Sequence, residues 1–169
     1  MLISEIKDKV KQIKKQYSLN SIPVDLNKIL KKESIEVVEK NFVELELKVS
    51  KQISGMLYIA GNTKLILVNE QDNKKRQNFT IAHELGHYYL HGGQNAKDEV
   101  FVSFREDSNQ KETEANKFAA ALLMSDDEVK DEYNLVIFPT VSYLADKFDV
   151  SKMAMRIKLE QMGLSYIEL

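Results

Sequence analysis

Five consecutive residues near the middle of the chain, His83-Glu84-Leu85-Gly86-His87, have the types and spacing of a hydrolytic metal site. On an α-helix, residues four apart lie one turn apart on nearly the same face, so both imidazoles can point at one ion. Glu84 lies beside them and can take a proton from a water molecule that such an ion activates. The H-E-x-x-H pattern therefore predicts two zinc ligands, His83 and His87, and a general base, Glu84.

The metal site needs a third ligand, and the nearby His91 is poorly placed to supply it. Its Cα lies about 12 Å along the helix axis from that of His83, whereas zinc–nitrogen bonds are about 2.0–2.1 Å long. Metzincins bring in a third histidine by placing a glycine three residues after the second one, but that position is Leu90 here. We expect His91 to interact with the carbonyl groups at the end of the helix, and a contact with the substrate is the alternative.

Carboxylates on a second helix offer a better third ligand. In the segment 112–116 (ETEAN), Glu112 and Asn116 are four apart and share a helix face. We predict that Glu112 binds the metal and that Asn116 accepts a hydrogen bond from a ligating histidine, which fixes its tautomer. Glu114 lies about 200° away around the helix and is the second choice. Four other acids also remain possible ligands, namely Asp98, Glu99, Glu106 and Asp107. Alternatively, Glu112 and Glu114 bind no metal and are solvated acids, which the helix dipole favours in a first turn.

The pattern of apolar residues predicts the elements that hold these side chains. Helices are expected at 3–17, 25–31, 110–124, 126–133, 140–148 and 151–162, with a motif helix that starts within 72–78 and stops at 92–93. Strands are expected at 34–38, 53–60 and 64–68, with a continuation of the first at 43–47 left open. Gly61-Asn62 forms a hairpin turn between the last two. The fold class is α+β: a mainly helical domain with a small three-stranded antiparallel sheet on the motif helix.

Two glycines and one polar stretch carry further expectations. Gly86 lies inside the motif helix, where glycine costs about 1 kcal/mol relative to alanine, so a strand or a ligand should pass close to it. Gly55 would let another backbone approach the strand at 53–60, which we expect to border the cleft and to pair with an extended substrate. The polar stretch 95–109 is expected to be a mobile loop.

Composition narrows the class of protein. The chain has 169 residues, of which 43% are hydrophobic and 30% charged, as expected of one globular domain spanning 1–169. Its net charge of -2 gives no general attraction to nucleic acid or to an anionic membrane. It has no cysteine, which excludes disulfides and thiolate ligands and fits a reducing compartment. Without a membrane-length apolar run or a signal-peptide core, we expect a cytoplasmic protein.

The last two predicted helices, at 140–162, could form a helix-turn-helix or could pack on the rest of the domain. Apolar residues such as Phe148 need burial, whereas the second helix has three cations, Lys152, Arg156 and Lys158. A helix that reads DNA normally has a denser basic face. We therefore expect the pair to pack on the domain and to offer a docking surface to a partner, without direct contact to nucleic acid.

Two segments together resemble the ImmA/IrrE family of zinc metallopeptidases. The first is 76–87 (RQNFTIAHELGH), which contains the motif, and the second is 112–124 (ETEANKFAAALLM). The resemblance extends more weakly over roughly residues 20–164, through the predicted hairpin and the C-terminal helices. In that family, the two histidines and a glutamate of the second segment bind zinc, and the glutamate after the first histidine is the base.

The resemblance implies roles for individual residues in a zincin-like fold: zinc ligands His83, His87 and Glu112, and the base Glu84. Members of the family typically cleave a transcriptional repressor at a specific site. The resemblance thus implies a zinc-dependent endopeptidase whose protein substrate is a helix-turn-helix repressor of a mobile element or of a stress response. The alternative is a non-catalytic regulatory module that contains zinc and binds a repressor or DNA. A structural zinc site needs no base, so Glu84 favours the enzyme.

Overall fold

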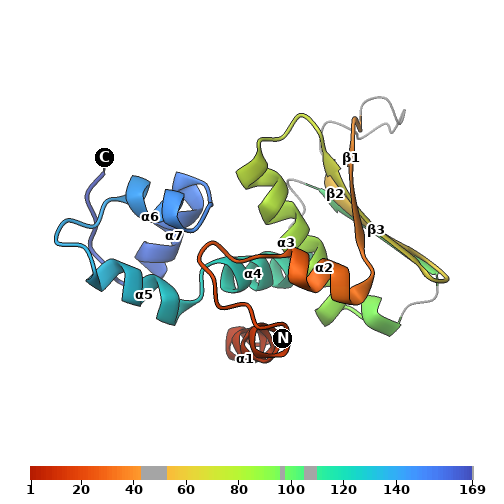
Figure 1. The fold of residues 1–169 in the computed structure, drawn as a ribbon, viewed down its shortest axis with the longest axis horizontal. Coiled ribbons are helices and arrows are strands. Elements are labelled where there is room, and N and C mark those ends of the chain that lie inside the picture. The colour runs from red at the N-terminus through yellow and green to blue at the C-terminus, as the bar shows by residue number, and fades with distance from the viewer. Residues whose placement is uncertain (43–52, 96–97, 105–109, 169) are drawn as a thin grey trace.

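The computed structural model describes residues 1–42, 53–95, 98–104 and 110–168. Figure 1 shows the sheet and α2 on one side and α5 to α7 on the other, with α3 and α4 between them. The elements are α1 (Ile3–Gln16), α2 (Asn27–Glu33), β1 (Glu36–Lys40), β2 (Ile53–Ala60), β3 (Thr63–Asn69), α3 (Lys74–Leu90), the 3₁₀ turn η2 (Gly93–Asn95), β4 (Asp98–Phe104), α4 (Gln110–Leu123), α5 (Asp126–Asn134), α6 (Val141–Lys147) and α7 (Lys152–Gln161). Each expected helix is present, with ends that differ by a few residues.

The sheet contains four strands in the order β1-β3-β2-β4, and it is mixed. β2 and β3 form the expected antiparallel hairpin, in which Ala60 lies opposite Thr63. β1 instead runs parallel to β3, with Val37 opposite Ile66. The mainly helical α+β class with a small sheet is confirmed. The expectation of three antiparallel strands is wrong, because the sheet has four strands and β1 is parallel to β3. Residue periodicity shows which faces are apolar, not which strands are neighbours. The continuation left open at 43–47 lies outside the described residues.

The fourth strand falls within the stretch 95–109, which the sequence favoured as a loop. β4 pairs antiparallel with β2, from Asp98 opposite Ala60 to Phe104 opposite Ile53. Valine and phenylalanine in this segment favour strands, but the polar residues on either side obscure the signal. β2 is consequently an inner strand, paired with β3 on one side and β4 on the other. The prediction that β2 pairs with a substrate is therefore wrong.

Helix α3 carries the H-E-x-x-H motif and packs against both the sheet and α4. It begins after Asn73, whose side chain accepts a hydrogen bond from the backbone N–H of Arg76 (3.0 Å). At Gly86, an added Cβ would lie only 3.0 Å from the Cα of Ala115 in α4. The close neighbour expected at this glycine is thus a helix, not a strand or a ligand. Because Gly86 has no side chain, α4 approaches closely enough to bring Glu112 to the histidines.

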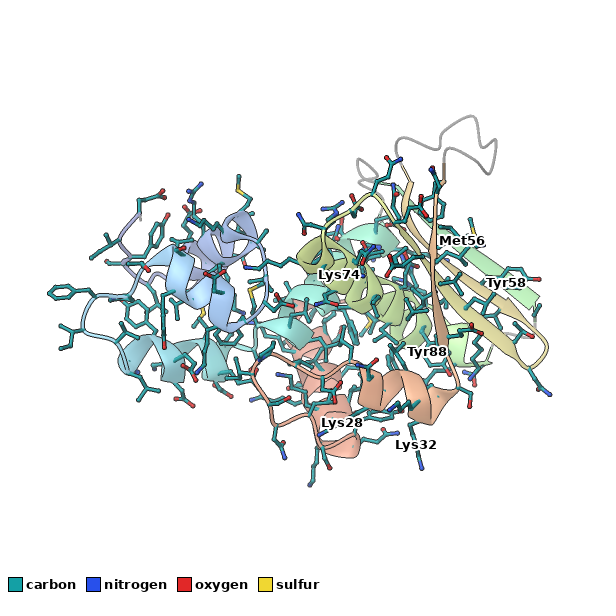
Figure 2. All side chains as sticks on the ribbon, turned by 45° about the horizontal axis from the view of Figure 1, so that its top comes forward. Lys28, Lys32, Met56, Tyr58, Lys74 and Tyr88 are labelled. Carbon is teal, nitrogen blue, oxygen red and sulfur yellow. The ribbon has the colours of Figure 1, made fainter. Side chains whose placement is uncertain are left out.

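Tyr88 connects the other end of α3 to the sheet and to α2. Its hydroxyl group donates a hydrogen bond to Glu33 (2.7 Å) and accepts one from Lys64 (2.8 Å). In Figure 2, Tyr88 lies between α3 and α2, beside the lower part of β1. This link holds the C-terminal half of the motif helix in a fixed position relative to the sheet.

The C-terminal helices α5 to α7 continue from the end of α4 and contact both α1 and α3. Lys75 of α3 forms an ion pair with Asp146 of α6 (2.6 Å). Asp126 of α5 binds Lys7 of α1 and Lys158 of α7, each at 2.5 Å. None of the helices in the described ranges is long and apolar enough to span a membrane.

Candidate metal centre

Helix α3 places two imidazoles side by side, as the four-residue spacing predicts. His83 and His87 are both buried, and their Nε2 atoms lie 3.1 Å apart. Both rings contact Glu112 of α4, whereas the neighbouring side chain of Glu84 packs against Gly55 of β2. The two nitrogen atoms can therefore bind one ion together.

Helix α4 adds a carboxylate to this pair. Glu112 is 5% exposed, and its Oε2 lies 3.0 Å from Nε2 of His83 while its Oε1 lies 3.0 Å from Nε2 of His87. Among the described residues, these three form the group of potential metal ligands whose donor atoms converge, all within 4.8 Å of one another. The structure thus brings together the three predicted metal-binding residues from two helices. The side chains of the alternative acids at 98–107 lie outside the described part.

The outer nitrogen of His83 contacts Asn116, one turn after Glu112 on α4. Nδ1 of His83 lies 2.9 Å from Oδ1 of Asn116. If Nε2 binds a metal, Nδ1 carries the proton and donates it to this amide oxygen. Such a bond fixes the tautomer and the ring orientation of a ligating histidine. Asn116 thus lies where the spacing to Glu112 predicts.

The outer nitrogen of His87 contacts His91, and this link was not expected from the sequence. The Nδ1 atoms of the two rings lie 2.9 Å apart, and Nε2 of His91 lies 3.1 Å from Oε2 of Glu114. The side chain of His91 therefore joins His87 to Glu114, in place of the expected contact with the carbonyls at the helix end. The other oxygen of Glu114 accepts hydrogen bonds from Gln110 (2.9 Å) and from the Met1 amino group. Glu114 lies behind the histidines and not among the converging atoms.

Glu84 is fully buried against the neighbouring strand β2. A Cβ added at Gly55 would lie 2.8 Å from Oε1 of Glu84 and 2.3 Å from Cγ2 of Thr80. Gly55 therefore accommodates side chains of α3, and not a substrate backbone as the sequence indicated. The motif predicts Glu84 beside the histidines, and its charge does act on His83. Only the packing of α3 on β2 shows which strand confines it.

The charges around the three donor atoms favour a cation. Burial raises the pKa of Glu112, but hydrogen bonds from His83 and His87 outweigh it and bring the pKa to about 2. Burial lowers the pKa of His83, yet the hydrogen bond to Glu112 and the charge of Glu84 outweigh this effect, and the net shift is upward. The upward shift of His83 shows that two carboxylates, Glu112 and Glu84, stabilise a positive charge at this position. A divalent metal ion would supply such a charge.

A helix with H-E-x-x-H, a glutamate from a second helix and a small sheet packed on the first define a zincin-like fold with a candidate metal centre. The family model for peptidase M78, described as the IrrE N-terminal-like domain, matches residues 31–160. Metallopeptidase ImmA of Bacillus subtilis (strain 168) is 30% identical over 112 residues, which are 66% of this chain and 66% of that protein. The aligned part thus spans just under two thirds of this relative. The chain belongs to the ImmA/IrrE family of metallopeptidases.

Proposed function

We propose that this chain is a zinc-dependent endopeptidase that cleaves a specific protein. The observation that carries the proposal is the convergence of His83, His87 and Glu112, together with the buried carboxylate of Glu84, whose charge acts on His83. Three metal ligands with an adjacent base are what hydrolysis requires, whereas a structural site needs a closed set of four ligands and no base. The name of the Bacillus subtilis relative, a metallopeptidase, supports a peptide bond as the target.

The choice of zinc is supported by the donor set and by its dimensions. Two imidazoles and a carboxylate form the His₂Glu arrangement typical of catalytic zinc. A tetrahedral zinc ion with bonds of about 2.0–2.1 Å holds its donor atoms roughly 3.3 Å apart. The contacts among His83, His87 and Glu112 are 3.0 to 3.1 Å long, so small side-chain movements would suffice to bind the ion.

Each residue of the site has a distinct part in the proposed reaction. A bound zinc ion would polarise the peptide carbonyl group and acidify a water molecule. Glu84 takes the proton from that water and passes it to the leaving nitrogen of the cleaved peptide bond. Asn116 holds the ring of His83, so that its Nε2 keeps its lone pair directed at the ion. Burial of Glu84 next to Gly55 restricts its carboxylate to one region of the site.

A helix-turn-helix transcriptional repressor of a mobile element or a stress response is the substrate that we propose. This part rests on the resemblance to the ImmA/IrrE family and on the comparisons, which support family membership. A repressor substrate would require the enzyme to act where the DNA is, so a cytoplasmic location belongs to the same proposal.

The test begins with the gene neighbourhood, where any helix-turn-helix repressor encoded beside the gene of this protein is taken as the candidate substrate. The purified protein is loaded with zinc and incubated with the repressor, and mass spectrometry identifies the fragments. We expect a single cleavage site, loss of cleavage when a chelator removes the metal, and recovery when zinc is restored. If the zinc-loaded protein binds the repressor but leaves it intact, the function is that of a regulatory module and not of a peptidase.

A further inference from the structure

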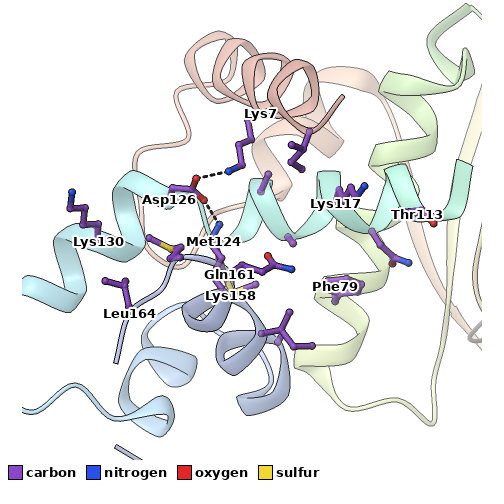
Figure 3. Close-up of a pocket in the computed structure, with 17 residues that line it drawn as sticks. Lys7, Phe79, Thr113, Lys117, Met124, Asp126, Lys130, Lys158, Gln161 and Leu164 are labelled. Atoms are coloured by element: carbon purple, nitrogen blue, oxygen red, sulfur yellow. Dashed lines mark hydrogen bonds and ion pairs between the residues drawn. The ribbon is translucent and has the colours of Figure 1, made fainter. Parts of the chain in front are cut away.

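A groove of about 680 Å³ lies near the candidate metal centre and is lined by residues of α1, α3, α4, α5 and α7. In Figure 3 it extends from Phe79 and Thr113 at one end to Lys130 and Leu164 at the other. Sites for bound ligands typically measure about 300–1,000 Å³. The groove therefore has room for several side chains of a bound molecule.

One end of the groove adjoins the residue that supports His83. Asn116 lines the groove and is exposed, and its side-chain oxygen lies 2.9 Å from Nδ1 of His83. Phe79, which also lines it, precedes His83 by one helical turn and so shares its face of α3. The groove thus lies on the outer side of the His83 ring, close enough to receive a segment of a substrate that is bound at the metal centre.

Apolar side chains from four helices form much of the groove. They include Phe79 of α3, Ala120 of α4 and Met162 next to the end of α7. Ile3 of α1 and Ile157 of α7 also line it, although they are 45% and 46% exposed. Burial of these two side chains by a partner would remove apolar surface from water, which stabilises the bound state.

The charged residues of the groove have a strong excess of one sign. Four lysines line it, Lys7, Lys117, Lys130 and Lys158, and Asp126 is the carboxylate among the lining residues of the described chain. Asp126 already binds Lys7 and Lys158, whereas Lys117 and Lys130 are exposed. The groove is therefore basic although the whole chain has a net charge of -2. Complementary charge steers and orients an acidic partner.

We propose that this groove binds a segment of the protein substrate in which acidic side chains flank aliphatic ones. The proposal rests on the proposed function, because it takes the bound chain to extend from the bond that is cleaved. The apolar lining would receive the aliphatic side chains, and Lys117 and Lys130 would pair with the acidic ones. Specificity then comes from α4, α5 and α7, away from the reacting atoms.

The experiment measures binding separately from cleavage. The probe is a fluorescein-labelled synthetic peptide of about a dozen residues that alternates glutamate with leucine or isoleucine, and a matched peptide has lysine in place of every glutamate. Each is titrated into the zinc-loaded Glu84→Gln protein, and fluorescence anisotropy reports the Kd. We expect the acidic peptide to bind about tenfold more tightly than the basic one, with an affinity that falls as salt is added.

Two variants and a matched control assign that binding to the groove. The double substitution Lys117→Glu with Lys130→Glu should raise the Kd of the acidic peptide about tenfold, and Ile157→Ser should weaken both charge forms of the peptide. The control is Lys31→Glu with Lys32→Glu, which changes the net charge equally at exposed residues of α2. Figure 2 shows Lys32 on the side of the molecule away from α5 to α7. The control should leave the Kd unchanged, and zinc content and circular dichroism confirm that each variant is folded.

Several results would overturn the proposal. They are equal binding of the two peptides, no binding of either, or equal losses in the groove and control variants. Self-association of the protein that disappears in Ile157→Ser would assign the groove to a second copy of the chain. Failure of the proposed function is seen in other measurements: the wild-type protein would not bind zinc or would not cleave the repressor. The Kd values of the two peptides are measured independently of cleavage and can still be compared.

Discussion

Two layers of side chains surround the candidate metal centre, and they are built differently. The inner layer consists of His83, His87 and Glu112, three buried residues whose donor atoms face one another. The outer layer supports the two rings unequally. His83 contacts the exposed amide of Asn116, which also lines the groove, whereas His87 contacts the buried ring of His91.

The comparison shows how two glutamates of one helix can differ in role. Glu112 and Glu114 are two positions apart on α4, and both are buried. Glu112 meets the Nε2 atoms of the histidines on α3, whereas Glu114 meets His91 and the Met1 amino group. The hydrogen bond from that amino group is the main reason why the pKa of Glu114 falls to about 2. A residue type therefore does not define a ligand, since the direction of its side chain decides what it binds.

The largest expected effect separates chemistry from metal binding within the inner part of the site. Glu84→Gln should lower the rate of repressor cleavage about 10²–10⁴-fold, because a general base typically contributes that much. Zinc content should stay at the wild-type level, since Glu84 is not among the converging donor atoms. Cleavage at the wild-type rate by the zinc-loaded variant would refute the assignment of the base.

The two glutamates should differ in metal affinity. Glu112→Gln should weaken zinc binding by more than about 100-fold, because it removes a ligand, and losses of supporting contacts alone reach about 10–100-fold. Glu114→Gln is the matched control and should change the affinity far less. Competition with a chromophoric chelator measures both, and a larger loss at Glu114 would transfer the ligand role to that residue.

The outer layer should produce intermediate losses, which test whether its two sides act independently. Asn116→Ala and His91→Phe should each weaken zinc binding about 10–100-fold, since each frees the outer nitrogen of one ligand. In a double-mutant cycle, His91→Phe combined with Glu114→Gln should cost little more than His91→Phe alone, because both residues support His87 through one link. Additive losses in that cycle would show that Glu114 acts by another route.

The smallest expected effect concerns the strand that confines the base. Gly55→Ala should destabilise the protein by about 1–3 kcal/mol, because the new methyl group overlaps Thr80 and Glu84. Adding Thr80→Ser removes the closest of these atoms and should restore part of the loss. Urea unfolding measures both variants. An unchanged midpoint in Gly55→Ala would mean that β2 and α3 separate easily and do not confine Glu84.

The sequence by itself determined what depends on spacing within one helix. His83 and His87 share a face of α3, and Glu112 and Asn116 share a face of α4, because four residues make about one helical turn. For the same reason His91 could be set aside as a ligand. The motif and its resemblance to a known family were readable because they are local patterns, and the comparisons confirm the family.

The tertiary structure decided what depends on contacts between distant parts of the chain. Strand order is one case: β4 covers the edge of β2, so Gly55 serves packing against Glu84 and not substrate binding. The approach of α4 at Gly86 and the link from His91 to Glu114 are others. His91 and Glu114, for example, are 23 positions apart in the sequence. Periodicity cannot predict them, because it specifies which face of an element is buried but not which element covers that face.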